Sequence, residues 1–96
     1  MQIVIRPAAA ADIEDAFVWY EQQRSGLGAG FLKILGDALI AIQRAPQLHP
    51  VIHRDTRRAL IRRFPYGIYY RIYPDLIVVV ACMHGRRDPR RWQARS

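Results

Sequence analysis

The sequence has little of several features that would point to common classes of protein. Cys82 is the only cysteine, so no disulfide can form within the chain. Its apolar surroundings favour a small buried side chain over a reactive thiol. The longest strongly apolar run, Leu76–Met83, is far shorter than the roughly 20 residues of a membrane-spanning helix. No apolar signal segment follows Arg6, so we expect a cytoplasmic protein without a membrane anchor.

Motifs for metal, phosphate or nucleophilic chemistry are also missing. His49 and His53 are separated by Pro50, which disfavours a shared helical face, and no third ligand has suitable spacing. The alternating glycines of residues 26–30 follow a predicted helix and lack the lysine of a P-loop, so they indicate a hinge. No Ser–His–Asp set or pair of carboxylates can be argued. We therefore expect no metal and no cofactor.

Positive charge, in contrast, is abundant and unevenly placed. The net charge is +7, and Lys33 is the only lysine. Residues 51–96 hold eleven arginines against three aspartates, a net charge of +8, whereas residues 1–50 hold four basic and five acidic residues. Guanidinium groups bind carboxylates and phosphates through paired hydrogen bonds. The C-terminal half therefore indicates a surface for nucleic acid, an anionic protein or acidic lipid; a surface that only keeps the protein soluble is the alternative.

The length and the hydrophobic pattern predict one α+β domain over residues 1–96. Half of the residues are hydrophobic (51%), which is enough for a core, but a domain of this size is marginally stable alone. We expect an N-terminal strand and an antiparallel helical hairpin packed on a mainly antiparallel curved β-sheet. The expected strands are Gln2–Arg6, Arg57–Arg63, Tyr66–Tyr73 and Leu76–His84, and the expected helices run from Ala8 to about Gln23 and from Leu27 or Gly28 to Ala45.

The two faces of the strand Tyr66–Tyr73 differ in character. Strict alternation places Tyr66, Ile68, Tyr70 and Ile72 on a core face, and Gly67, Tyr69, Arg71 and Tyr73 on a face that is wet or touched by a partner.

The strand Leu76–His84 is apolar on both faces. Alternation would group Leu76, Val78, Val80 and Cys82 on one face, and Ile77, Val79, Ala81 and Met83 on the other. Both faces of such a strand must be covered, and the helical hairpin covers only one. The second cover is the C-terminal tail, a second copy or another protein; the short, arginine-rich tail favours an external partner.

Two segments resemble the RelE/ParE toxin superfamily, and the resemblance extends over essentially the whole chain. Residues Arg63–Ile72 (RFPYGIYYRI) resemble its strand pair, and Ile77–Trp92 (IVVVACMHGRRDPRRW) resemble the end of the fold. The closing HGRRDPRRW is similar to that of ParE-type, or plasmid stabilisation, toxins in particular. Gly26–Gly28, Phe31 and Pro46 match the frame of the second helix.

The resemblance implies a toxin of a type II toxin–antitoxin system, with a cognate antitoxin whose C-terminal segment wraps it. ParE-like members poison DNA gyrase and block replication, whereas RelE-like members cut messenger RNA on the ribosome. The leading interpretation is a ParE-like toxin that inhibits growth by binding gyrase. The alternatives are a ribosome-dependent endonuclease and a degenerate member that serves only as a binding module.

Candidate site residues follow from these alternatives. For a nuclease, His84 would act as acid or base, with Arg62, Arg63 and Arg71 stabilising charge. After His84, however, the sequence lacks the lysine and the C-terminal tyrosine of RelE proper, and a structural His84, bonded to backbone or to Asp88, is the competing interpretation. For contacts with a target or antitoxin, the candidates are Arg58, Tyr69, Arg71, Tyr73, His84, Arg86, Arg87, Arg90 and Trp92. Trp92 is also a candidate for folding back on the sheet, and Asp88 for pairing with Arg87 or Arg91.

Overall fold

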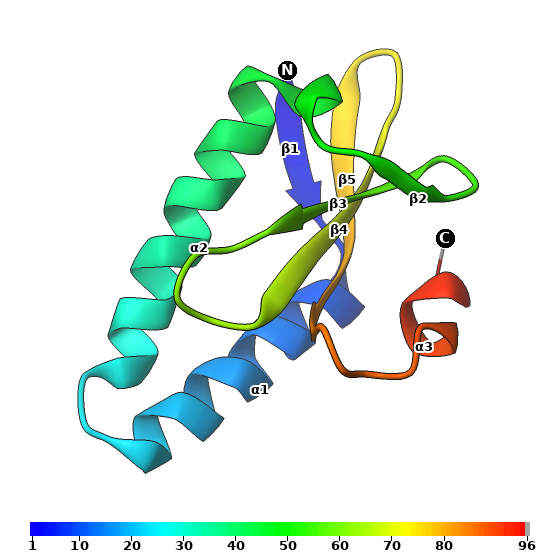
Figure 1. Ribbon diagram of the computed structural model, residues 1–96. Coiled ribbons are helices and arrows are strands. Elements are labelled where there is room, and N and C mark those ends of the chain that lie inside the picture. The colour runs from blue at the N-terminus through cyan, green and yellow to red at the C-terminus, as the bar shows by residue number, and fades with distance from the viewer. Residues whose placement is uncertain (96) are drawn as a thin grey trace.

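The computed structural model describes residues 1–95, in which two long helices lie on one side of a five-stranded sheet and a short helix on the other (Figure 1). The elements in order are β1 (Gln2–Ile5), α1 (Pro7–Gln23), α2 (Leu27–Arg44), the 3₁₀ helix η1 (Pro46–Leu48), β2 (Val51–His53), β3 (Thr56–Leu60), β4 (Tyr66–Ile72), β5 (Leu76–His84) and α3 (Arg90–Gln93). The strand order is β1-β5-β4-β3-β2. Only β1 pairs in parallel, with β5; the other pairs are antiparallel. The predicted fold class is confirmed.

The segment between α2 and β4 differs from the sequence-based expectation. Residues 46–53, expected as a loop, contain η1 and β2. A single 3₁₀ turn and a three-residue strand are too short to give a recognisable hydrophobic period. The strand expected over Arg57–Arg63 is β3, which ends at Leu60 because the chain then turns, with Arg63 in a left-handed conformation (φ 70°). None of the helices in residues 1–95 is long and apolar enough to cross a membrane.

The turn between α1 and α2 is tight and held by one side chain. Gly26 has a φ of 89°. The carboxylate of Glu21 accepts hydrogen bonds from the backbone N–H groups of Gly26 and Gly28, both at 2.9 Å. These bonds satisfy donors that the first turn of α2 would leave open, and they lower the pKa of Glu21. The glycines therefore make a capped turn that brings both helices onto the same side of the sheet.

A β-bulge in β5 changes which residues face the helices. Tyr70 pairs with Val79 and Tyr69 pairs with Ala81, so Val80 is an additional residue in β5. Beyond the bulge, Cys82 packs with Ile77 and Val79 on the helix side. The residues that pack together on the opposite side are Val78, Val80, Ala81 and Met83. The prediction of strict alternation along β5 was therefore wrong after Val80, because one extra residue inverts the order of the faces.

The second face of the sheet is covered by the chain itself. Trp92 from α3 is 6% exposed, and its ring stacks on Tyr69 with centroids 4.6 Å apart. The residues Val78, Val80, Ala81 and Met83 beneath this cover are all buried. The expectation of an external cover for this face was wrong, because Trp92 folds back from the tail onto it and Ile52, Tyr73 and Leu76 pack against the same cluster. What stays open is a cleft at the His84 end of β5.

Candidate functional site

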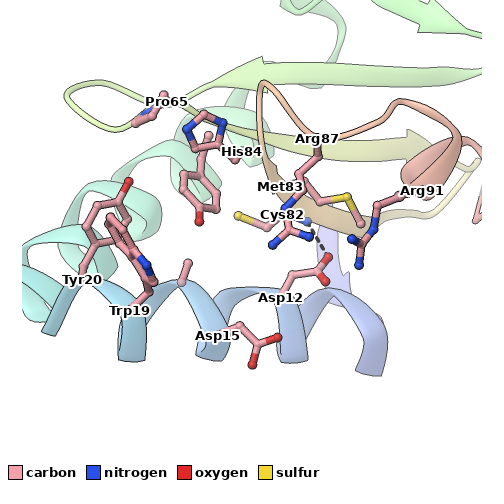
Figure 2. Close-up of a pocket in the computed structure, with 12 residues that line it drawn as sticks. Asp12, Asp15, Trp19, Tyr20, Pro65, Cys82, Met83, His84, Arg87 and Arg91 are labelled. Carbon is pink, nitrogen blue, oxygen red and sulfur yellow. Dashed lines mark hydrogen bonds between the residues drawn. The ribbon is translucent and has the colours of Figure 1, made fainter. Parts of the chain in front are cut away.

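A cleft of about 570 Å³ lies between α1 and the arginine-rich segment that follows β5. Figure 2 shows its walls: acidic and aromatic side chains from α1 on one side, and Arg87 and Arg91 on the other. Its lining residues are Asp12, Asp15, Ala16, Trp19, Tyr20, Pro65, Tyr66, Cys82, Met83, His84, Arg87 and Arg91. We refer to this feature as the α1 cleft. A volume of this size falls in the range of ligand sites in proteins.

The aromatic end of the cleft contains one unusually exposed side chain. Trp19 is 54% exposed, and its ring meets Tyr20 edge-on with centroids 5.0 Å apart. Tyr20 is buried and also contacts Tyr66, Phe31 and Phe64. Burial raises the pKa of both Tyr20 and Tyr66, so their hydroxyls stay protonated at neutral pH. Trp19 thus presents an exposed apolar surface that packs against the buried ring of Tyr20.

The floor of the cleft is formed by the end of β5. Cys82 is 1% exposed, and burial together with the nearby charge of Asp12 raises the pKa of its thiol to about 12. This confirms that Cys82 is a buried apolar residue. Beside it, the Nδ1 of His84 accepts a hydrogen bond from the backbone N–H of Arg86 at 3.0 Å, and the ring packs near Tyr66. His84 is therefore bonded to backbone, as its structural interpretation predicts.

Within residues 1–95, the two arginines of the cleft form no ion pair with a carboxylate. Arg87 and Arg91 are both exposed. The Arg87 guanidinium partly opposes the rise in the pKa of Tyr66, which places its charge near the cleft. The sequence suggested that Asp88 pairs with Arg87 or Arg91, but it forms an ion pair with neither. It pairs with Arg90 at 2.6 Å, since the turn into α3 brings these two side chains together.

On the opposite wall, the two acids of α1 have different surroundings. Asp12 Oδ2 accepts hydrogen bonds from the backbone N–H of Cys82 at 3.0 Å and from Arg95 Nη1 at 2.6 Å. Asp15 is exposed. Asp12 is therefore occupied by the fold, whereas Asp15 leaves a negative charge at the cleft.

The candidate nuclease residues do not meet at one point. Tyr66 pairs with His84, whereas Arg71 pairs with Val78. Five residues of strand separate these two levels, about 17 Å at ~3.4 Å per residue. Arg71 forms an ion pair with Asp55 at 3.3 Å, and its Nε is buried with no hydrogen-bond partner among residues 1–95. His84 and Arg71 cannot both reach one phosphate in this arrangement.

The other two candidate nuclease residues, Arg62 and Arg63, belong to the turn before β4. Arg62 lines a separate groove of about 310 Å³ between α2 and the end of β3. Arg63 is exposed and does not line either cleft. Among residues 1–95, no group of three or more His, Cys, Asp or Glu side chains is placed to hold a metal ion.

The residues expected to contact a partner are also dispersed. Tyr69 is 2% exposed under Trp92; burial raises its pKa, and the nearby Arg58 guanidinium partly opposes this rise. The expectation that Tyr69 is wet or touched by a partner was therefore wrong, because the tail of the chain covers it. Tyr73 is half-buried and lies under the Arg71 guanidinium at 5.7 Å. Arg86 and Arg90 are exposed in the tail.

Of the nine expected partner-contact residues, only His84 and Arg87 line the α1 cleft. The sequence reasoning did not identify Asp12, Asp15 and Trp19 as site residues. One signal was present, because residues 12, 15 and 19 are spaced three and four apart and so share a helix face. The sequence could not show which segment faces them.

Comparison with known proteins identifies the family of this chain. The sequence matches the model of the family described as ParE toxin of type II toxin-antitoxin system, parDE, over residues 3–89. No curated protein sequence matches it. Its fold is similar to that of a chain from the chromosomal ParDE TA system of P. aeruginosa, with a TM-score of 0.67, 18% identity, and coverage of 88% of this chain and 95% of that one. At that identity the structural likeness concerns the fold alone. The family match covers most of the sequence, and the chain belongs to the ParE toxin family of type II toxin–antitoxin systems.

Proposed function

We propose that residues 1–96 act as one ParE-type toxin domain that inhibits growth by binding DNA gyrase and blocking replication. A cognate antitoxin neutralises it, and both events take place in the cytoplasm. The family match supports a toxin, and the parDE description supports an antitoxin partner. The basic C-terminal half supports an anionic protein surface as the target.

We favour binding over cleavage because the candidate nuclease residues are dispersed over the structure. Cutting RNA without a metal needs a base, an acid and positive charge around one phosphate. Here His84 and Arg71 lie at opposite ends of the β4–β5 pair, and Arg62 lines the other groove. This arrangement supports a protein that acts by occupying its target.

One observation favours the ribosome-dependent endonuclease as the second candidate. His84 lies at the α1 cleft beside Arg87, and its Nδ1 is bonded to backbone while Nε2 has no hydrogen bond within residues 1–95. A histidine fixed in this way could exchange a proton through Nε2. A degenerate member that only binds its partner is the third candidate.

Two assays with the purified protein separate these candidates. We expect inhibition of gyrase supercoiling and intact messenger RNA on translating ribosomes. His84→Ala should weaken this inhibition at most, and His49→Ala serves as the matched control in the other groove. Rapid cleavage of messenger RNA that His84→Ala abolishes would instead identify the endonuclease. If induced expression of the wild-type chain leaves growth unaffected, the binding-module alternative is correct.

A further inference from the structure

We propose that the α1 cleft is a docking site for a short amphipathic segment of the antitoxin. In this arrangement an apolar side chain of the segment packs against Trp19 and the floor of the cleft, and a neighbouring carboxylate meets Arg87 and Arg91. The identity of the partner rests on the proposed toxin function. The chemistry of the segment rests on the cleft alone.

The tail arginines divide into those that the fold uses and those that it leaves for a partner. Arg90 is bound by Asp88 and Arg95 by Asp12, both at 2.6 Å. Arg87 and Arg91 form no ion pair among residues 1–95, and Figure 2 shows both extending from the C-terminal segment toward α1. A guanidinium group can bind a carboxylate through two parallel hydrogen bonds, and two such groups lie at this wall.

The opposite wall argues against nucleic acid as the occupant. Asp15 is exposed at the cleft, with Asp12 on the preceding turn of α1. A continuous phosphate backbone lying along Arg87 and Arg91 would also be brought close to these carboxylates, and like charges repel at short range. A peptide can place an acidic residue toward the arginines and a neutral or basic residue toward Asp15. Charge complementarity therefore favours a protein segment.

The middle of the cleft provides the apolar contact. Cys82 and Met83 lie in its floor, Ala16 of α1 lines its side, and Trp19 on the same helix has 54% of its surface exposed. An exposed tryptophan beside an apolar floor and a basic wall has the composition of an interface hot spot. Burial of one apolar side chain there would remove Trp19 from water.

The test measures binding of the antitoxin encoded beside the toxin gene to the full-length toxin. We expect Trp19→Ala and the double variant Arg87→Glu/Arg91→Glu each to weaken binding at least tenfold. Arg24→Glu changes an exposed arginine at the end of α1, outside the cleft, and should bind within twofold of wild type. In a Trp92→Phe background, where Trp19 is the only tryptophan, saturating antitoxin should shift its fluorescence to shorter wavelength and protect it from iodide quenching.

Each outcome separates this inference from the proposed function. Unchanged antitoxin affinity in both cleft variants would overturn the inference even if the protein inhibits gyrase. Loss of antitoxin binding in these variants would support it even if the wild-type chain leaves gyrase unaffected. A single-stranded RNA 12-mer that binds wild type and loses affinity in the Trp19→Ala variant would overturn the choice of a protein segment. An unaltered Trp19 fluorescence spectrum at saturating antitoxin would overturn the α1 cleft as the docking site.

Discussion

The carboxylate of Asp12 and the guanidinium of Arg95, 83 residues apart in the sequence, are joined by hydrogen bonds of 2.6 and 3.2 Å. The same carboxylate accepts the backbone N–H of Cys82, and Arg95 Nη1 also donates to the carbonyl of Val80 at 3.2 Å. Asp12 and Arg95 therefore join α1, the bulge of β5 and the C-terminal segment at one point. This junction positions the tail that forms the basic wall of the α1 cleft.

Removal of Asp12 should destabilise the protein because two donors lose their acceptor. We expect Asp12→Ala to lower the free energy of unfolding by about 1–3 kcal/mol, the usual effect of leaving such donors unsatisfied. The control is Asp37→Ala, because Asp37 forms an exposed pair with Lys33 at 4.0 Å and such pairs contribute ~0–1 kcal/mol. Urea unfolding of both variants measures the difference. Equal effects would show that the Asp12 junction contributes little.

Truncation of the two tryptophans should change the stability of the protein by very different amounts. Trp92 is 6% exposed and stacked on Tyr69, so Trp92→Ala should cost about 3–5 kcal/mol of stability. Trp19 is 54% exposed, so Trp19→Ala should change stability by only about 0.5 kcal/mol. Thermal unfolding followed by circular dichroism provides the measurement. A Trp92→Ala variant as stable as wild type would contradict the structural function assigned to this ring.

Two glycines of α2 should give opposite signs when replaced by alanine. A Cβ at Gly28 would lie 2.7 Å from the carbonyl oxygen of Phe17, so Gly28→Ala must push the helices apart and should cost about 1–3 kcal/mol. A Cβ at Gly30 would meet no atom within 4 Å. Gly30→Ala should therefore stabilise the helix by about 0.5–1 kcal/mol. Chemical denaturation of the pair tests this, and a stabilising Gly28→Ala would refute the close approach of α1 and α2.

The thiol of Cys82 predicts a loss of stability at alkaline pH. Burial raises its pKa to about 12 in the folded protein, against 9.0 for a free thiol. The folded state thus favours the protonated form, so this contribution is complete below pH ~9 and declines as the pH rises toward 12. The decline should be shallower in Cys82→Ala, as measured by unfolding between pH 8 and 11. Native wild-type protein should also react slowly with iodoacetamide at pH 8 and rapidly after unfolding.

Local pattern was sufficient for the helices and for the long strands. The apolar spacing along α1 and α2 predicted both within two residues, and β5 was predicted at its observed bounds Leu76–His84. The alternation in β4 correctly placed Ile68 and Tyr70 in the main core and Tyr69 on the other face. These features depend on neighbours within a few residues, which periodicity records.

The sequence pattern did not predict features that depend on contacts between distant segments. Asp12 binds the backbone N–H of Cys82 and the guanidinium of Arg95, which are 70 and 83 residues away in the sequence, so no local pattern indicated these contacts. Likewise, the exposed tail arginines looked alike in sequence, whereas the fold pairs Arg90 and leaves Arg87 unpaired within residues 1–95.

The sequence by itself determined the α+β architecture, the basic C-terminal half and the membership of the toxin family, because these rest on composition, period and ordered motifs. Only the tertiary structure decided that Trp92 covers the second face of the sheet, and that a bulge at Val80 turns Cys82 toward α1. It also decided which arginines remain at the cleft. The physical reason is that one extra residue in a strand exchanges its two faces, and that a charged group pairs with groups close to it in space, whatever their separation in the sequence.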